Sequence, residues 1–258
     1  MSTCIALEVR KSSLLPKQGW KADYVEQEKP KHDNRAILKD LERQRELLTI
    51  GAYAAGCGAL AGVTFFTPLI PAFMPSLAIL LGRLQTVSQQ VLLMQRLIEA
   101  FEEEGIEIHP RLNPPDLKQI DFFLRFSDKK FILLKIGSQG DSTVSFNEST
   151  EKLQYRKKGG GLKNWEPDPL SVLNLQVLWI ARERRDLKGG SSRDARRPVA
   201  KFLILWGATK LGDHNEHLYS TMAGYQALWI KKFGATCIVQ EDQAIEAIKA
   251  YLAKDREQ

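Results

Sequence analysis

The sequence predicts a mixed α/β domain over residues 83–258, preceded by a two-helix transmembrane hairpin over residues 47–82. Three observations lead to this prediction. From Leu47 to Gly82, 36 consecutive residues carry no charge. Behind this run, segments with strand-like alternation and segments with helical periodicity follow one another. No internal repeat divides the chain, and 258 residues suit one ordinary domain with an accessory segment.

The uncharged run is long enough for membrane helices. A helix needs about 20 residues to cross the hydrocarbon core of a bilayer, and residues 47–66 meet that length. Pro68, Pro71 and Pro75 then predict a turn, after which LAILLG continues the apolar run to Arg83. Two spans joined at this turn explain the whole run, with the short second span tilted, kinked or re-entrant. The alternative is a buried helical hairpin inside a soluble protein.

Small residues recur within the first predicted span, and Gly58 with Gly62 forms a GxxxG pair. Such spacing lets helices approach closely. The pair indicates packing against the second span or against another copy in a homo-oligomer, or it reflects only the ordinary composition of membrane helices.

The charges that flank the hairpin predict its orientation. Basic residues precede the first span, while the predicted turn has no charge; they are Lys31, Arg35, Lys39, Arg43 and Arg45. The positive-inside rule then places the N-terminus in the cytoplasm, and a hairpin returns the C-terminal domain to the same side. Residues 1–46 form a cytoplasmic segment in this prediction, disordered up to Asn34 and then a short charged helix. The segment lacks the apolar core of a signal peptide.

Behind Arg83 the pattern predicts helices and strands in alternation. The predicted helices are 84–104, 169–185, 216–233 and 243–254, and the predicted strands are 106–112, 119–126, 130–136, a weak one at 142–146, 201–206 and 236–239. The segment GGSSRDARRP at 189–198 predicts a flexible basic loop.

Several function classes find no support in the sequence. Cys4, Cys57 and Cys237 are too far apart for a disulfide framework or a zinc site, which favours a reducing compartment. His214 and His217 do not form HExxH. The loops that bind nucleotides or dinucleotides and the GxSxG elbow of serine hydrolases are missing as well.

The net charge of +6 is concentrated in one stretch. Residues 152–201 hold 13 Lys or Arg against 5 Asp or Glu. Such a stretch suits DNA, RNA or anionic headgroups, or it is a solvated loop. The candidate nucleic-acid-binding residues are Arg156, Lys157, Lys158, Arg182, Arg184, Arg185, Arg196 and Arg197.

Two charged residues lie on neighbouring predicted strands in the middle of the domain. Asp121 is near the start of the first strand and Lys135 at the end of the second, and the turn at 127–129 brings these strands side by side. The segments IDFFLRF at 120–126 and FILLKIGSQG at 131–140 resemble two strands of the PD-(D/E)xK nuclease superfamily and of its nuclease-related (NERD) family. Trp165 with DPLSVLNLQ at 168–176, and KFLILWG at 201–207, are similar to a later helix and strand of that family.

The resemblance implies a restriction-endonuclease-like mixed sheet flanked by helices. It also implies a divalent metal, Mg²⁺ or Mn²⁺, held by Asp121 and used in phosphodiester cleavage, with Lys135 stabilising charge on the phosphate and Gln176 facing the site. The chain departs from the family at Leu133, where the pattern has a metal-binding glutamate. The candidates to replace it are Glu99, Asp141 and Glu148. The alternative is that Asp121 and Lys135 form a pair at the strand edge without chemistry.

Two functions follow from these observations. The first is a membrane-tethered nuclease-like domain that binds nucleic acid, with weak or absent phosphodiesterase activity. The second is a non-enzymatic membrane scaffold whose basic surface contacts anionic lipid or a partner protein.

Overall fold

The computed structural model describes residues 32–65, 70–232 and 234–254, without the side chains of residues 58–76 and 254. Asp33–Gln258 forms one compact unit. Residues 1–31 of the predicted disordered segment and the turn residue Pro68 lie outside the described residues, and so do the side-chain surroundings of Gly58 and Gly62.

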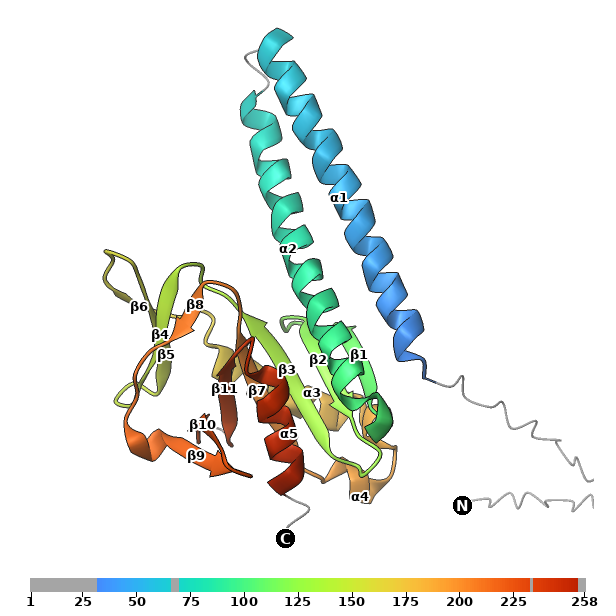
Figure 1. Cartoon of the computed structure of the whole chain (residues 1–258), viewed down its shortest axis with the longest axis vertical. Coiled ribbons are helices and arrows are strands. Elements are labelled where there is room, and N and C mark those ends of the chain that lie inside the picture. The colour runs from blue at the N-terminus through green and yellow to red at the C-terminus, as the bar shows by residue number, and fades with distance from the viewer. Residues whose placement is uncertain (1–31, 66–69, 233, 255–258) are drawn as a thin grey trace, which may run out of the picture. The chain divides into compact units, whose positions relative to one another are not determined.

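The elements follow one another in the order of Figure 1. The helices are α1 (Asn34–Phe65), α2 (Ile70–Phe101), α3 (Pro169–Glu183), α4 (Ser192–Ala195) and α5 (Ala244–Lys254), with short 3-10 turns η2 (Glu102–Glu104), η3 (Arg185–Lys188) and η4 (Glu216–Leu218). The strands are β1 (Glu107–Leu112), β2 (Ile120–Arg125), β3 (Phe131–Gly137), β4 (Ser142–Asn147), β5 (Lys152–Lys157), β6 (Leu162–Asn164), β7 (Val199–Leu205), β8 (Thr209–Leu211), β9 (Tyr219–Met222), β10 (Tyr225–Ile230) and β11 (Thr236–Gln240).

Two long helices, α1 and α2, form a hairpin that extends away from the sheets (Figure 1). The predicted charged helix and the first apolar span are one continuous helix, α1, because Asp33 caps its start and nothing in its sequence breaks it. The second apolar segment likewise continues into the predicted amphipathic helix as α2. The prediction that Pro71 and Pro75 lie in the turn is wrong. Both lie at the start of α2, where Pro71 needs no backbone donor and Pro75 removes a single helical hydrogen bond.

The start of α1 and the end of α2 are bonded to each other and to the α/β part of the unit. Arg35 on α1 pairs with Glu102 at a distance of 2.8 Å, and the Asn34 side chain bonds the backbone on both sides of Glu107. Gln95 on α2 donates to Glu42 on α1. The second half of α2 also packs its apolar side into the core, from Val87 to Phe101.

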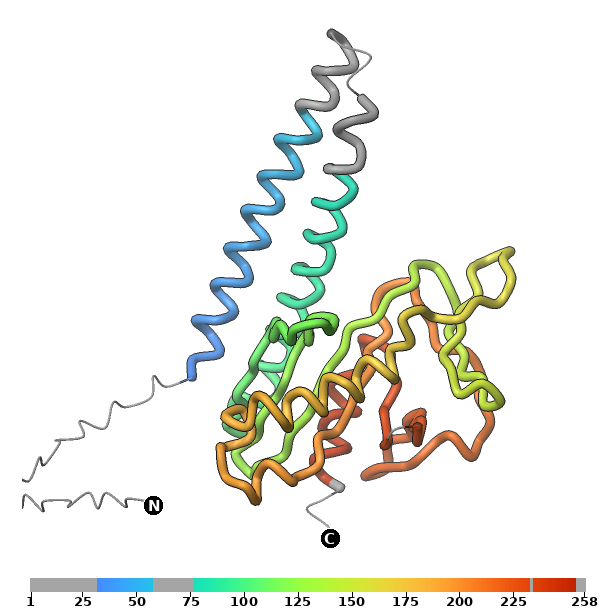
Figure 2. The backbone as a smooth tube through the Cα atoms, turned by 180° about the vertical axis from the view of Figure 1, so that it is seen from behind, coloured from blue at the N-terminus to red at the C-terminus, as the bar shows by residue number. Residues whose placement is uncertain are grey.

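A mixed seven-stranded sheet, in the order β1-β2-β3-β7-β11-β10-β9, forms the centre of the α/β part. Strands β3, β7 and β11 are parallel and the others are antiparallel. Helices α2 and α5 cover one face, while α3 and the four-stranded sheet β6-β5-β4-β8 cover the other (Figures 1 and 2). This arrangement confirms the predicted mixed α/β fold with helices on both sides of the sheet.

The predicted helix over 216–233 is wrong. This segment forms η4 and the antiparallel hairpin β9–β10. Ala223 and Gly224, both with positive φ, make its two-residue turn, and Ala227–Ile230 are buried in the sheet. The segment 189–198, predicted as a flexible loop, contains α4, and the buried ammonium of Lys188 donates to the carbonyls of Ala195 and Arg197.

Within the described residues, one helical stretch, Leu77–Glu104, is long and apolar enough to cross a membrane by length and composition. Its best 18-residue window has a mean hydropathy of 1.2, and 28% of that window is buried in the protein. From Val87 onward this stretch packs its apolar side into the core on the sheet, while Leu92 stays exposed. The described residues therefore contain one candidate span, where the sequence analysis predicted two.

Candidate functional site

Asp121 and Lys135 lie side by side where β2 and β3 stop pairing. The Nζ atom of Lys135 is 4.0 Å from Oδ2 of Asp121, and the two side chains are 15% and 13% exposed. The last paired residues of the two strands are Phe122 and Leu134. One step beyond them, Asp121 Oδ2 accepts a hydrogen bond of 2.8 Å from the backbone nitrogen of Ile136. The carboxylate therefore accepts the hydrogen bond that a backbone carbonyl of β2 would accept if the β2–β3 pairing continued.

Burial dominates the electrostatics of this pair. It raises the pKa of the Asp121 carboxyl, while the charge of Lys135 and the hydrogen bond from Ile136 act in the opposite direction. Burial also lowers the pKa of the Lys135 ammonium, against the attraction of Asp121. The charge of each group is thus stabilised mainly by the opposite charge of the other.

The residues around Asp121 do not fit a divalent metal site. Leu133, at the position where the nuclease pattern has glutamate, is fully buried in the core between the sheet and α3. In the described part of the chain, no group of three His, Cys, Asp or Glu side chains could hold a metal ion. A single carboxylate paired with a lysine holds Mg²⁺ or Mn²⁺ poorly, so we derive no metal-dependent chemistry from this pair.

The structure provides no evidence that another carboxylate replaces the missing glutamate. Glu148 bonds Asn215 and His217 beside β4. Asp141 is exposed in the loop before β4, and Glu99 is exposed on α2.

Gln176 has a structural role at the start of β2. Its buried Nε2 on α3 donates to the carbonyls of Lys118 and Gln119, at 2.9 and 3.2 Å. It therefore fixes the chain just before Asp121 without bonding to the carboxylate.

The eight predicted nucleic-acid-binding residues fall into two groups. Arg156, Lys157 and Lys158 are exposed at the turn between β5 and β6. The other five lie in the last turn of α3 or just after α3 or α4; they are Arg182, Arg184, Arg185, Arg196 and Arg197. Figures 1 and 2 show the β5–β6 hairpin and α4 at different ends of the α/β part, so the structure does not bring the two groups into one surface.

Two residues of the second group already have acidic partners. The guanidinium of Arg184 lies 2.9 Å from Asp186, and Nε of Arg197 lies 3.3 Å from Asp194. The other three residues of this group, Arg182, Arg185 and Arg196, are exposed, as are the three residues at the β5–β6 turn.

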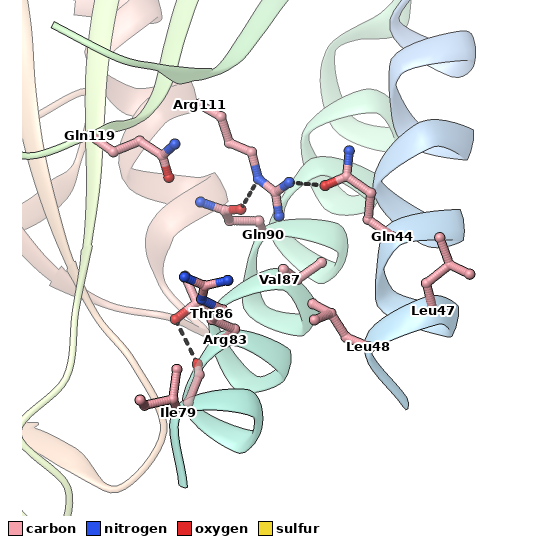
Figure 3. Close-up of a pocket in the computed structure, with 11 residues that line it drawn as sticks. Gln44, Leu47, Leu48, Ile79, Arg83, Thr86, Val87, Gln90, Arg111 and Gln119 are labelled. Atoms are coloured by element: carbon pink, nitrogen blue, oxygen red, sulfur yellow. Dashed lines mark hydrogen bonds between the residues drawn. The ribbon is translucent and has the colours of Figure 1, made fainter. Parts of the chain in front are cut away.

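A chain of hydrogen bonds links Asp121 to the hairpin. Buried Gln90 on α2 donates to Asp121 Oδ1 at 3.4 Å and accepts from Nε of Arg111 at 2.7 Å. Arg111 also donates to Gln44 on α1. Arg111 stands opposite Asp121 in the β1–β2 register and has a φ of 54°, so the ladder is interrupted at this pair. Figure 3 shows the Arg111 guanidinium extending from β1 toward the two helices.

Arg111 and Gln90 line a pocket of about 750 Å³ at the base of the hairpin (Figure 3). It is lined by Gln44, Leu47, Leu48, Ile79, Gly82, Arg83, Thr86, Val87, Gln90, Arg111 and Gln119. Sequence reasoning missed this pocket, because its walls come from α1, α2, β1 and the segment before β2. The indication in the sequence was that the predicted strands 106–112 and 119–126 are consecutive and could pair, which would make Arg111 and Asp121 neighbours.

At the pocket and beyond it, the hairpin exposes large apolar side chains. On α1 these are Leu47 (61% exposed), Ile50 (65%) and Tyr53 (73%), and on α2 they are Ile79 (61%) and Leu81 (50%). Apolar side chains clustered in this way on a surface mark a contact with protein or membrane.

The two helices change from charged to uncharged at the same level. Gly51 on α1 faces Leu80 on α2, because a Cβ on Gly51 would lie 3.3 Å from Cδ2 of Leu80. Glu46 lies five residues before Gly51 and Arg83 three residues after Leu80. At a helical rise of about 1.5 Å per residue, these charges lie within about 3 Å of each other along the hairpin.

Comparison of the chain with protein-family models, with curated proteins and with solved structures gives no match in any of the three.

Proposed function

We propose that the chain is a membrane-anchored, non-catalytic binding protein. In this proposal the hairpin over residues 47–82 inserts into a bilayer, and the α/β part lies at the cytoplasmic surface, where it binds an anionic partner. The observation that carries the proposal is the group of exposed apolar side chains on both helices, including Ile50 and Ile79. In water this surface would be costly, at about 25 cal/mol per Å² of apolar area.

The charge pattern supports entry of both helices into the bilayer at the same level. The uncharged parts of α1 and α2 begin at a common level, as the boundary of a bilayer requires. From there α1 continues for about 28 Å and the uncharged part of α2, Ile70–Gly82, for about 20 Å. A hairpin of this length enters from one side, and the basic residues before Leu47 favour the cytoplasmic side for both termini.

In this proposal the α/β part is a nuclease-like domain that does not cleave phosphodiester bonds. The adjacency of Asp121 and Lys135 supports the resemblance, and so does the order in which β1, β2 and β3 follow α2 and precede α3 and β7, with β4, β5 and β6 inserted before α3. Leu133 in the core and the lone carboxylate of Asp121 argue against metal-dependent cleavage. We therefore assign the Asp121–Lys135 pair a structural role at the end of the β2–β3 ladder.

Flotation of the full chain with liposomes after alkaline washing tests the anchoring. Wild-type protein is expected to float with the lipid, and the Ile50→Lys/Ile79→Lys variant is expected to remain in the soluble fraction. Leu178→Lys is the matched control, since Leu178 is a half-exposed leucine on α3 outside the hairpin. Wild-type protein that stays in the soluble fraction contradicts the proposal.

A second candidate function, binding of DNA or RNA, rests on the β5–β6 turn. Arg156, Lys157 and Lys158 are consecutive, exposed and next to the glycines 159–161. Binding through such a turn would be weakly selective for sequence and would fall steeply with salt. Titration of labelled DNA and RNA with the full chain and with Arg156→Gln/Lys158→Gln checks it. Equal binding by both proteins rules out this turn as the site.

A further inference from the structure

The pocket at the base of the hairpin is divided into a polar and an apolar side. Gln44, Gln90 and Arg111 are joined by hydrogen bonds at one end of the pocket, which Arg111 reaches from β1 (Figure 3). Leu48 and Ile79 lie further toward the connection between α1 and α2, and Figure 3 shows Arg83 and Thr86 beside Ile79. A ligand that fills both sides has a polar and an apolar part.

The charge of the pocket is positive. Arg83 and Arg111 are the charged residues among those that line it. Within the described part of the chain, hydrogen bonds connect Arg111 to carboxylates only through the side-chain amides of glutamine residues. Gln44 bonds both Arg111 and Asp40, and Gln90 bonds both Arg111 and Asp121, whose carboxylate also faces Lys135.

Arg111 retains donors for an anion. A guanidinium has five N–H donors, and the hydrogen bonds of Arg111 in the described part of the chain use two of them, for Gln90 and Gln44. Burial lowers the pKa of this guanidinium, with Asp40 opposing the effect, so its charge is incompletely compensated. Arg83 is exposed on α2 at the edge of the same pocket.

We propose that this pocket binds the phosphate headgroup of one anionic phospholipid, with Arg83 and Arg111 on the phosphate and Leu47, Leu48 and Ile79 along the first carbons of the acyl chains. Arginine is suited to this role because its planar fork bonds phosphate through two parallel donors. A volume of about 750 Å³ is within the usual range for small-molecule sites.

The position of the pocket favours a lipid over a soluble anion, and this step rests on the proposed membrane anchoring. The pocket lies at the level where both helices become uncharged, since Arg83 and Leu47 mark that boundary and both line it. Headgroup phosphates of a bilayer that surrounds the hairpin lie at this depth. A free phosphate would use the arginines and leave the apolar wall empty.

Native mass spectrometry of the full chain in detergent, titrated with phosphatidylglycerol or phosphatidylcholine, tests the site. Wild-type protein is expected to retain one phosphatidylglycerol and to prefer it over phosphatidylcholine. Arg83→Gln and Arg111→Gln should each weaken retention about tenfold, since one charge-assisted contact contributes about 1.4 kcal/mol. Arg193→Gln removes an exposed arginine on α4, outside the pocket and outside the candidate binding residues, and should leave retention unchanged.

Two further measurements separate the possible outcomes. Inorganic phosphate or glycerol 1-phosphate that displaces the lipid at equal concentration identifies the pocket as a soluble-anion site and overturns the lipid proposal. Arg83 is exposed, so its variant tests the site without disturbing the core. Equal retention by wild type and Arg83→Gln also overturns the proposal. Flotation of the same proteins tests the membrane anchoring separately. A protein that floats but shows no preference for phosphatidylglycerol supports the anchoring and contradicts only the headgroup site.

Discussion

The carboxylate of Asp121 accepts a hydrogen bond of 2.8 Å from the backbone nitrogen of Ile136, at the point where β2 and β3 separate. This contact gives Asp121 a structural purpose that needs no metal. It satisfies a donor that the ladder leaves free, and it places the carboxylate beside Lys135.

Removal of this carboxylate should destabilise the fold. Asp121→Ala leaves the Ile136 donor unsatisfied and Lys135 without its counter-charge, so we expect a loss of about 2 kcal/mol. Asp121→Asn keeps an acceptor oxygen and should lose less. Urea unfolding of the full chain in detergent measures both, with the exposed Asp141→Ala as control. Equal stability of Asp121→Ala and wild type would show that the contact contributes nothing.

Replacement of Leu133 by the glutamate of the nuclease pattern should destabilise the protein and should not create a metal site. Leu133→Glu places a carboxylate in a fully buried apolar environment, and we expect destabilisation of about 3 kcal/mol or more. Leu133→Met, similar in volume, should cost less than about 1.5 kcal/mol. Thermal unfolding with and without Mg²⁺ checks the prediction. Metal-dependent stabilisation or DNA cleavage by Leu133→Glu would instead indicate a metal site that has lost one ligand.

Gly137, at the end of β3, is required by the packing of Trp165. A Cβ at this position would lie 2.8 Å from Cη2 of Trp165 and 3.1 Å from Cδ1 of Leu203. Gly137→Ala should therefore destabilise the protein by about 1–3 kcal/mol. The matched control is Gly161→Ala, which meets nothing within 4 Å. Unfolding midpoints that shift equally for both variants would contradict this assignment.

His214 should make stability depend on pH. Its Nε2 accepts a hydrogen bond of 2.9 Å from the backbone nitrogen of Phe146, and Nδ1 donates to the carbonyl of Gly212, so the folded protein requires the neutral ring. Burial lowers the pKa of His214 below its ordinary value of 6.5. The unfolded chain then binds more protons than the folded chain between the lowered pKa and 6.5, and stability falls as the pH falls through this window.

Melting temperatures across this pH window compare wild type with His214→Gln, whose amide oxygen can still accept from Phe146. We expect a shallower pH dependence in the variant. An identical slope in the two proteins would mean that His214 does not control it.

Much of the sheet could be predicted from the sequence because its central strands are short apolar runs between turn residues. The predicted strands 119–126, 130–136 and 201–206 are β2, β3 and β7. The start of α3 was also predictable, since Asp168 caps the helix and Pro169 occupies its first position. The weaker strands β5 and β6 were missed because most of their residues are polar and exposed.

The remaining errors have physical causes. The hairpin β9–β10 was predicted as a helix because YQALWI has no strict alternation; four consecutive residues, Ala227–Ile230, are buried on both faces of the sheet. The pocket depends on contacts among Gln44, Gln90 and Arg111, which lie far apart in the sequence. The positive φ of Arg111 was also not apparent, since arginine rarely adopts it.

Bilayer contact by the hairpin is the central claim, and the native Cys57 provides the most direct measurement of it. Cys57 is exposed on α1 within the uncharged run. We would attach a bimane fluorophore to Cys57, with Cys4 and Cys237 replaced by serine, and reconstitute the chain with lipids brominated on their acyl chains. The control carries the fluorophore at Ser192→Cys on α4, with all three native cysteines replaced. Strong quenching at residue 57 and none at residue 192 is the predicted result. Equal, weak quenching at both positions would contradict membrane insertion and favour a hairpin that packs against protein.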